Sequence, residues 1–339
     1  MNKQIYFLLS FFIFFGAVAQ NENKTTLLFQ DQAPLNIKLS YSNKKMRVKT
    51  NDSTLIKTTL SYQQDNVWKT VDVSLRARGN FRRSKCYFPP IKMKIKKSNG
   101  KGTLFEGNKS LKLVLPCLLE KEKNDNILQE YLAYKFYENI SPYHFKTRRV
   151  DVTFEEIKGK KIVSHQLTGF LIEDDDNVAD RFEGRAFERY THPLAMDAIT
   201  SIKVSMHQYL IGNTDYSVAY QHNGKLLFVD KKILPLPYDF DMSGFVNPSY
   251  SVVNSTLGID SVRDRKYRGF KRDEDLVQEV RQQYLTKKDS FFKLLEDFES
   301  QFDIESQYSD SKKFLTSFFE VLEDDNAFKK KIINGMRTK

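Results

Sequence analysis

The chain has 339 residues, with 54 Lys and Arg against 43 Asp and Glu, and a formal net charge of +11 at pH 7. Its 27 Phe and 17 Tyr against one Trp predict an aromatic core, large enough for one big domain or two lobes to fold by burial alone. With only two cysteines, the chain does not depend on disulfides for folding, which excludes a disulfide-dense scaffold.

Residues 1–19 have the features of a secretory signal peptide. Lys3 gives a positive start, residues 5–15 are almost all apolar, and residues 17–19 form a small-x-small cleavage pattern. We therefore expect a mature chain that begins at Gln20 and is exported to the periplasm, the outer-membrane surface or the exterior. The apolar run is shorter than the roughly 20 residues of a membrane span, so we expect that the protein is not an integral membrane protein. An uncleaved N-terminal anchor is the alternative.

Residues 25–95 mostly alternate apolar with polar side chains, which is the period of half-buried antiparallel strands. One further strand is expected after the turn at 98–102. The expected strands are LNIKLSY (35–41), KKMRVKT (44–50), IKTTLSY (56–62), WKTVDVSLRARG (68–79), IKMKIKK (91–97) and SLKLVLP (110–116).

The segment between Asp72 and Glu106 contains ten basic residues and no acidic one. Such a tract is typical of a surface that binds phosphates or polyanions, or alternatively of a solvated strand face. Because no zinc-finger spacing, RNP motif or basic-helix heptad accompanies it, we expect no nucleic-acid partner. The basic tract comprises Arg76, Arg78, Arg82, Arg83, Lys85, Lys92, Lys94, Lys96, Lys97 and Lys101.

The chain has two cysteines, Cys86 and Cys117, and both lie in its strand-rich first part. An even pair in an exported protein is compatible with one disulfide. Two separate buried thiols are the alternative.

Helical periodicity begins after residue 122. Residues 125–140 carry one wide apolar stripe, with Glu130 outside it or at its edge. A strand hairpin is expected to follow at 148–173. A helix is then expected over 196–210, and Gly212 is suited to end it in the left-handed conformation.

The remainder of the chain from about Asp273 is also predicted to be helical. The order is therefore strand-rich, then mixed, then helix-rich. We expect an α+β chain with a β-rich N-terminal lobe at 20–122. Its mixed and then helical C-terminal lobe at 123–339 would carry the catalytic loop and the metal-binding segment.

Three carboxylates follow the helix at 196–210. Asp215 lies in the next loop, and after an expected hairpin with Asn223-Gly224 as its tight turn come Asp239 and Asp241. This order is similar to that of the catalytic half of a protein-kinase-like fold, where the first Asp orients the attacking hydroxyl and the later Asp binds Mg²⁺. Mg²⁺ prefers hard oxygen ligands, and two close carboxylates need a cation unless one of them stays protonated.

Three segments in this order resemble a known family. RARGNFRRSKCYFPPIKMKI (76–95), GNTDYSVAYQHN (212–223) and LPYDFDMSG (236–244) are similar to segments of the CotH-like kinases, named for a spore-coat protein. VRDRKYRGF (262–270) is similar to a segment of their exported Bacteroidetes branch. The resemblance covers about residues 70–275. It implies an atypical, two-lobed, kinase-like fold that binds ATP with Mg²⁺ and phosphorylates a protein hydroxyl.

The resemblance also implies roles for single residues. Asp215 would be the catalytic Asp, Asp239 the metal-binding Asp, and Asp241 a second ligand or its alternative. Asn223 would be the metal-binding Asn, although it follows Asp215 by eight residues rather than the five typical of protein kinases. Arg78 belongs to the family's RGN motif.

The nucleotide side of the expected site is less complete. Lys92 or Lys94 lies where a phosphate-contacting lysine is expected, and Glu130 could pair with it or be a surface residue. Glu173 could contact the nucleotide, while residues 173–176 as a whole are best interpreted as an exposed acidic turn. No Gly-rich nucleotide loop is visible.

Two alternative functions remain open from the sequence. One is a catalytically inactive, kinase-like scaffold or binding protein of the cell envelope, and the other is a two-metal phosphoesterase that uses the same three Asp residues. His222 is interpreted as a structural hydrogen-bonding residue rather than a catalytic one. The absence of HExxH, of a serine nucleophile elbow and of a CxxC pair argues against the common zinc enzymes and serine hydrolases.

Overall fold

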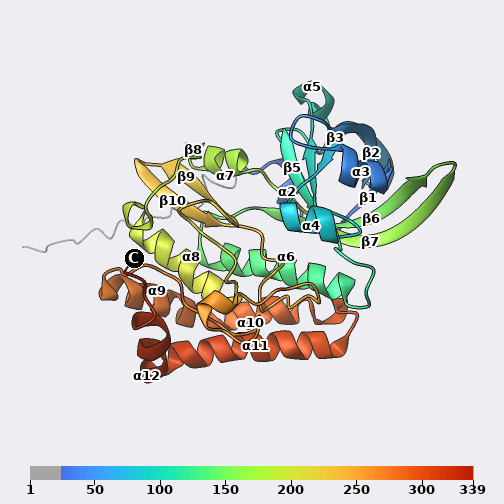
Figure 1. Ribbon diagram of the computed structural model, residues 1–339. Coiled ribbons are helices and arrows are strands. Elements are labelled where there is room, and N and C mark those ends of the chain that lie inside the picture. The colour runs from blue at the N-terminus through green and yellow to red at the C-terminus, as the bar shows by residue number, and fades with distance from the viewer. Residues whose placement is uncertain (1–23, 339) are drawn as a thin grey trace, which may run out of the picture.

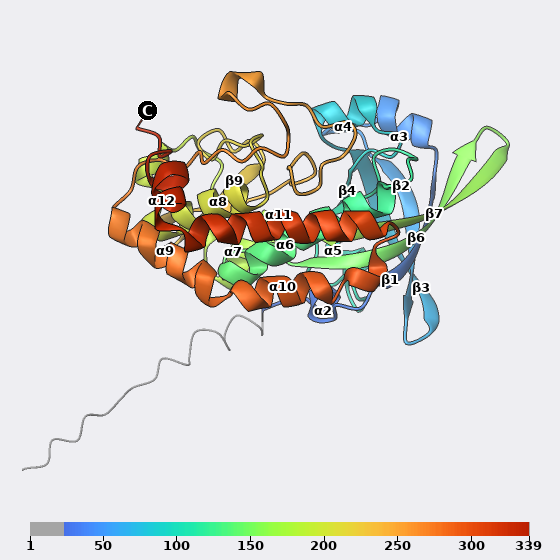
Figure 2. The same cartoon turned by 90° about the horizontal axis from the view of Figure 1, so that it is seen from below.

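The computed structural model describes residues 24–338, so the predicted signal peptide lies outside the described residues. A strand barrel occupies one end of the molecule, and long helices occupy the other (Figure 1). The view from below shows α11 running across the helical part (Figure 2). Among residues 24–338, no helix is both long enough and apolar enough to cross a membrane.

Seven strands form a closed barrel in the order β1-β2-β3-β4-β5-β7-β6. β1 closes the barrel by pairing in parallel with β6, from Leu35 opposite Val150 to Tyr41 opposite Glu156. Alternate side chains fill the interior, as the period-two pattern predicts. The strands are β1 (Leu35–Tyr41), β2 (Ile56–Gln64), β3 (Val67–Ala77), β4 (Ile91–Lys94), β5 (Ser110–Val114), β6 (Thr147–Lys158) and β7 (Lys161–Ile172).

The expected two-lobed protein-kinase-like fold is wrong, because the seven strands close on themselves as a mixed barrel. The hairpin formed by β6 and β7 explains the difference. It follows a long helix in sequence, yet β6 pairs with β1 and β7 pairs with β5. Pairing between segments that lie far apart in the sequence leaves no local mark, so alternation alone predicted the strands but not the closure.

Gly169 allows β7 to approach β5 closely. A Cβ atom at this position would lie 2.6 Å from the carbonyl oxygen of Val114. Any larger residue would therefore push the two strands apart, which makes Gly169 a requirement of closure. Beyond this region the hairpin continues outward, and its tip projects from the barrel in Figure 1 and Figure 2.

Four short helices lie on or beside the barrel, and one of them replaces an expected strand. The segment 44–50 was predicted to be a strand, which would place Met46 and Val48 on one face. Instead Met46 is fully buried while Val48 is 70% exposed, as helical geometry requires. The side chain of Ser42 caps this helix. The four helices are α2 (Leu27–Gln30), α3 (Asn43–Lys49), α4 (Asn80–Lys85) and α5 (Lys97–Gly100).

The helical part packs around α6 (Lys123–Ile140), which confirms the helix predicted at 125–140. α6 lies between the barrel and the C-terminal helices (Figure 1). Its buried aromatic side chains join one core with those of the later helices. The remaining helices are α7 (Asp175–Arg181), α8 (Ala198–Leu210), α9 (Glu274–Thr286), α10 (Lys288–Glu296), α11 (Glu305–Glu323) and α12 (Asp325–Phe328).

A small antiparallel sheet in the order β10-β9-β8 lies beside α8. Its strands are β8 (Arg185–Ala186), β9 (Gly224–Val229) and β10 (Lys232–Pro237). The expected tight turn at Asn223-Gly224 is wrong, because β9 only begins at Gly224. The chain reverses instead at Asp230 and Lys231, whose φ angles of 48° and 62° are those of a type I′ turn.

Candidate active site

A cavity of about 740 Å³ brings together most of the site residues expected from the sequence. Asp215, Asn223, Asp239, Asp241 and Arg78 all line it. They come from four places: the loop after α8, the residue before β9, the residue after β3, and the loop after β10. The cavity therefore lies between α4 of the barrel and the loops that flank β9 and β10.

Asp215 is held by its neighbours in the loop after α8. The backbone N–H of Asp215 donates to Oδ1 of Asn213 at 3.0 Å. Nδ2 of Asn223 donates to the carbonyl oxygen of Asp215 at 2.6 Å and to its Oδ2 at 3.1 Å, and Nε2 of His222 lies 3.0 Å from Oδ1. The carboxylate remains about half exposed. It is thus oriented but still reachable from the cavity.

The segment 262–270 holds this loop through hydrogen bonds. Arg268 donates through Nη1 to the carbonyl oxygens of Thr214 and Tyr216, on either side of Asp215. Gly212 ends α8 at φ 63°, which confirms the expected left-handed cap. The segment 262–270 therefore positions the Asp215 loop.

Asp239 has a φ angle of 63°, which lies in the left-handed region that residues other than glycine seldom adopt. Its N–H donates to the hydroxyl of Tyr134 at 3.0 Å. Its carboxylate forms ion pairs with Arg82 and, at 3.4 Å, with Arg78. Residues other than glycine that adopt the left-handed conformation are concentrated at functional sites, where the surrounding structure holds them in place.

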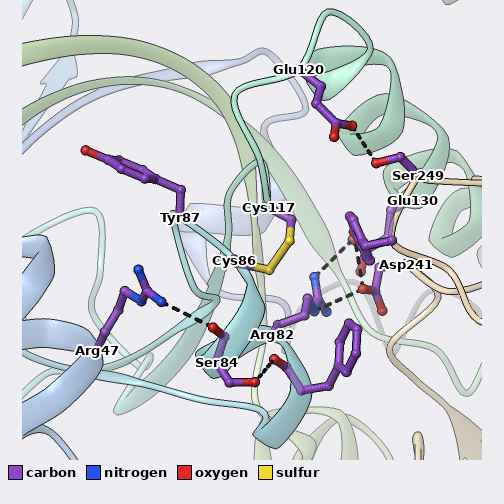
Figure 3. Close-up of a disulfide and its surroundings, with 12 residues drawn as sticks. Arg47, Arg82, Ser84, Cys86, Tyr87, Cys117, Glu120, Glu130, Asp241 and Ser249 are labelled. Atoms are coloured by element: carbon purple, nitrogen blue, oxygen red, sulfur yellow. Dashed lines mark hydrogen bonds and ion pairs between the residues drawn. A yellow bond between two sulfur atoms is a disulfide. The ribbon is translucent and has the colours of Figure 1, made fainter.

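Arg82 is the centre of a buried acidic cluster that we call the Arg82 cluster: Arg78, Arg82, Glu130, Asp239 and Asp241. Besides Asp239, the guanidinium contacts Asp241, with Nε 3.1 Å from Oδ2, and Glu130, with Nη1 3.7 Å from Oε2. Figure 3 shows Arg82 pointing from α4 toward Glu130 and Asp241. Glu130 was interpreted as a surface residue or as the partner of a lysine; instead it is 2% exposed and pairs with an arginine.

The three carboxyl groups of the Arg82 cluster have different pKa values. Burial raises the pKa of Glu130, and Arg82 offsets this only in part. Burial, with a smaller contribution from Asp239, also raises the pKa of Asp241. For Asp239, burial acts in the same direction, but Arg82 and Arg78 outweigh it and hold the pKa below its usual value. Asp239 is therefore the ionised member, and its two neighbours compete for a proton.

A disulfide between Cys86 and Cys117 holds the C-terminal end of α4. This confirms the first of the two possibilities left open for the cysteines. Figure 3 shows the disulfide above Arg82. The bond links the helix that carries Arg82 to the segment between β5 and α6, and so restrains both sides of the Arg82 cluster.

Mg²⁺ fits the donor set of this site. Three carboxyl groups face two guanidinium groups in the Arg82 cluster, so a bound cation would take the place of the proton for which Glu130 and Asp241 compete. Within residues 24–338 no group of three His, Cys, Asp or Glu side chains is arranged for a metal ion. Mg²⁺ nevertheless usually takes only one or two carboxylates, with phosphate and water oxygens as its other ligands. Asp239 and Asp241 would supply these, and Oδ1 of Asn223 a third oxygen.

The basic tract does not form one continuous surface. Only Arg78 and Arg82 of its ten members line the large cavity. Arg76 pairs with Asp52, and Arg83 donates to backbone carbonyl oxygens near α3. The charges of the tract are separated because it runs in turn through β3, α4, β4 and α5.

Neither lysine expected at the phosphates lines the large cavity. Nζ of Lys92 lies 4.0 Å from Oδ2 of Asp174, and Lys94 is exposed on the barrel surface. No pattern in the sequence pointed to Lys112. This residue lies on β5, opposite Lys92 of β4, and is buried because both faces of β5 are covered. Nζ of Lys112 lies 4.4 Å from the ring centre of Tyr238, which belongs to the cavity wall.

Replacing Lys112 with methionine is expected to stabilise the protein at pH 7. Burial lowers the pKa of Lys112 to about 8, so the folded protein binds fewer protons than the unfolded chain between pH 8 and 10.5. The free energy of unfolding should therefore rise with pH in that window, and the methionine variant should lose this rise.

The expected gain at pH 7 is about 1–3 kcal/mol, measured by urea unfolding. Asp175 keeps Lys225 as a partner in this variant, at 3.1 Å. Lys94→Met is the matched control on the neighbouring strand. A Lys112→Met protein that is less stable than wild type at pH 7 would contradict the prediction.

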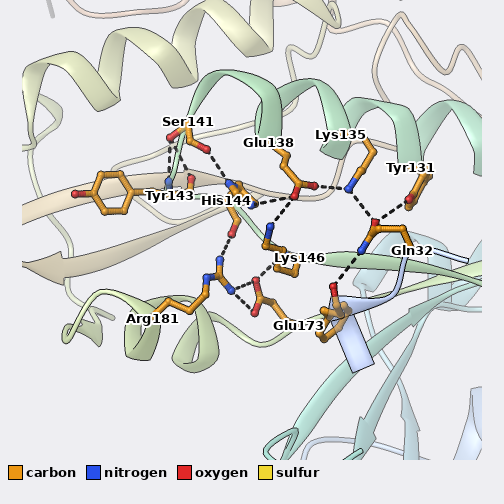
Figure 4. A network of polar contacts seen from close by, with 11 residues as sticks. Gln32, Tyr131, Lys135, Glu138, Ser141, Tyr143, His144, Lys146, Glu173 and Arg181 are labelled. Carbon is orange, nitrogen blue, oxygen red and sulfur yellow. Dashed lines mark hydrogen bonds and ion pairs between the residues drawn. The ribbon is translucent and has the colours of Figure 1, made fainter. Parts of the chain in front are cut away.

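Glu173 lies away from the large cavity. Its carboxylate pairs with Arg181 and accepts a hydrogen bond from the N–H of Lys146. Figure 4 shows this pair as part of a polar network beneath α6. The turn at 173–176 was expected to be exposed, but Glu173, Asp174 and Asp175 are buried. The turn is buried because its acids meet Arg181, Lys112 and Lys225.

The three segments at 76–95, 212–223 and 236–244 meet at one cavity. The first contributes Arg78 and Arg82, the second Asp215 and Asn223, and the third Asp239 and Asp241. Their convergence is a property of the tertiary structure and is independent of any alignment. No protein-family model matches the chain, and no curated protein sequence matches it.

Proposed function

We propose that this protein is an exported phosphotransferase that moves the γ-phosphoryl group of ATP to a protein hydroxyl with the help of Mg²⁺. The observation that carries the proposal is the large cavity, which joins an oriented carboxylate to the Arg82 cluster. Its volume of about 740 Å³ is in the usual range for small-molecule sites, roughly 300–1,000 Å³. The proposal rests on this cavity and not on the overall fold.

Asp215 would orient the acceptor hydroxyl and take its proton as the new P–O bond forms and ADP leaves. The contacts from His222 and Asn223 fix the carboxylate for this task. Arg78 and Lys225, both in the cavity wall, would bind phosphate oxygens. Bound Mg²⁺ would be held by Asp239 and Asp241, and would neutralise charge on the transferred group.

A nucleotide-binding scaffold without catalysis is the second candidate. Arg82 already neutralises Asp239 and Asp241 in part, and such a contact competes with a metal ion for the same oxygens. A two-metal phosphoesterase has less support, because its two ions need a denser set of carboxylates than this cavity provides.

Asp215→Asn is expected to reduce transfer of radiolabelled γ-phosphate to casein or to the protein itself by about 10²–10⁴-fold, the usual contribution of a general base. The stability of the variant should be unchanged, because the side chain is half exposed. Asp230→Asn, at the exposed turn between β9 and β10, is the matched control. Full activity in Asp215→Asn would exclude the assigned role.

ATP with Mg²⁺ is expected to raise the melting temperature, because a ligand that binds only the folded state stabilises it. At 100 times the dissociation constant the gain is about 2.7 kcal/mol. Both the enzyme and the scaffold predict this shift, and only the enzyme predicts transfer. Hydrolysis of a phosphodiester without any nucleotide would instead support the phosphoesterase.

A further inference from the structure

A second cavity of about 290 Å³ lies on the other side of the Asp215 loop. Thr214 and Asp215 line the large cavity, whereas residues 216–220 line the second one. Adjacent Cα atoms are only about 3.8 Å apart. A molecule bound in the second cavity would therefore lie next to the carboxylate assigned to the acceptor hydroxyl.

Three arginines and no acidic residue line the second cavity. Arg268 and Arg272 direct their described hydrogen bonds to backbone carbonyl and hydroxyl oxygens. In the part of the chain that the structure describes, neither these two nor Arg337 forms a salt bridge. Three like charges around so small a space repel one another, and an anion would relieve that repulsion.

The third arginine is built into the cavity wall. The N–H of Arg337 donates to the carbonyl oxygen of Gly269 at 2.8 Å, and the N–H of Lys271 donates to the carbonyl oxygen of Arg337 at 2.8 Å. The guanidinium lies 4.7 Å from the ring centre of Phe270. The C-terminal segment is thus fixed beside the segment that supports the Asp215 loop, and Arg337 is oriented without a carboxylate.

The other wall of the cavity is aromatic. Tyr190 and Tyr220 are strongly exposed, and their ring centres are 5.3 Å apart. The hydroxyl of Tyr216 is buried and has no hydrogen-bond partner among residues 24–338. This small cavity combines guanidinium groups that form no salt bridge, exposed aromatic rings and a buried hydroxyl. Such a lining suits an anion carried on an organic chain better than a free inorganic ion.

We propose that the second cavity docks an acidic segment of the acceptor protein. A Glu or Asp side chain of that segment pairs with Arg337 and with the free face of Arg268, and flanking residues lie against Tyr190 and Tyr220. The hydroxyl to be phosphorylated then reaches Asp215 across the loop. The proposal rests on the proposed function for this last step only, since the docking itself requires no nucleotide.

Binding of two short fluorescein-labelled peptides tests the proposal. Both carry a central serine, flanked by glutamates in one peptide and by glutamines in the other. Fluorescence anisotropy without nucleotide should show at least about tenfold tighter binding of the glutamate peptide, equivalent to about 1.4 kcal/mol. Arg337→Gln should weaken that binding about fivefold or more, and Lys271→Gln, a neighbouring basic residue outside the cavity, should not.

Equal affinity for the two peptides would overturn the proposal, and so would unchanged binding by a folded Arg337→Gln protein. Inorganic phosphate is the competitor that separates a small-anion site from a peptide site. Displacement by phosphate at concentrations near the dissociation constant of the peptide would also overturn it.

Transfer of γ-phosphate to the same peptides separates the two proposals. Selective binding without any transfer would contradict the phosphotransferase and leave the docking site standing. Equal transfer to both peptides, without selective binding, would contradict only the docking site.

Discussion

Replacing Arg82 with methionine is expected to lower the free energy of unfolding by about 3–5 kcal/mol, the usual cost of removing one partner from a buried ion pair. The variant leaves Asp239, Asp241 and Glu130 without their shared cation. Methionine retains much of the apolar stem, so the loss measures charge more than volume. Urea unfolding at pH 7 is the measurement.

A second substitution tests whether the loss comes from uncompensated charge. Glu130→Gln in the Arg82→Met background should recover part of the stability, and the two single changes should therefore not add. Lys85→Met is the matched control, because Lys85 lies on the same helix and is exposed. If Arg82→Met is no more destabilising than Lys85→Met, the Arg82 cluster does not have the importance assigned to it.

The same variant provides a test of the metal site that needs no catalysis. Without the guanidinium, the carboxylates of the cluster hold a larger excess of negative charge. Mg²⁺ should therefore raise the melting temperature of Arg82→Met more than that of the wild type. An Mg²⁺ response that is equal in both proteins would argue against Asp239 and Asp241 as the ligands.

The protein is expected to lose stability in mild acid because of His207. This side chain is fully buried, with both ring nitrogens lacking hydrogen-bond partners among residues 24–338. Burial lowers the pKa of His207 to about 3. Between pH 3 and 6.5 the folded protein thus binds fewer protons than the unfolded chain, and the free energy of unfolding falls as the pH falls.

The expected contribution between pH 6.5 and 4.5 is about 2–3 kcal/mol, at roughly 1.4 kcal/mol per pH unit. His207→Phe should remove this contribution, because a phenyl ring takes no proton. The new ring should pack against Tyr137 and Phe240 as the imidazole does. Thermal unfolding of both proteins across this pH range is the measurement, and only the difference between them is assigned to His207.

His222→Gln is the control for this pH dependence, since His222 is an exposed histidine. It should leave the acid sensitivity of the wild type in place. An identical pH profile for His207→Phe and wild type would show that the acid sensitivity comes from other groups.

Local patterns predicted many elements of this protein. The apolar stripe at 125–140, the hairpin at 148–173 and the helix before Gly212 are all present, because each depends on spacing within one segment. The order of Asp215, Asp239 and Asp241 along the chain also identified residues that share a cavity. Short-range signals sufficed for the helices and the hairpin because each residue's neighbours in sequence determine them, whereas the shared cavity depends on the tertiary structure.

The tertiary structure alone decided the closed barrel and the charge state of the site. Closure depends on β1 meeting β6, and Arg82 meets Glu130 and Asp241 only because the fold brings the side chain of α4 to α6 and to the loop after β10. Glu130 was expected at the surface, and Lys112 was not singled out, because a strand or helix face is buried or solvated according to what covers it, and that partner lies far away in sequence. The residue types of the site were therefore determined by the sequence, and their burial and pairing by the fold.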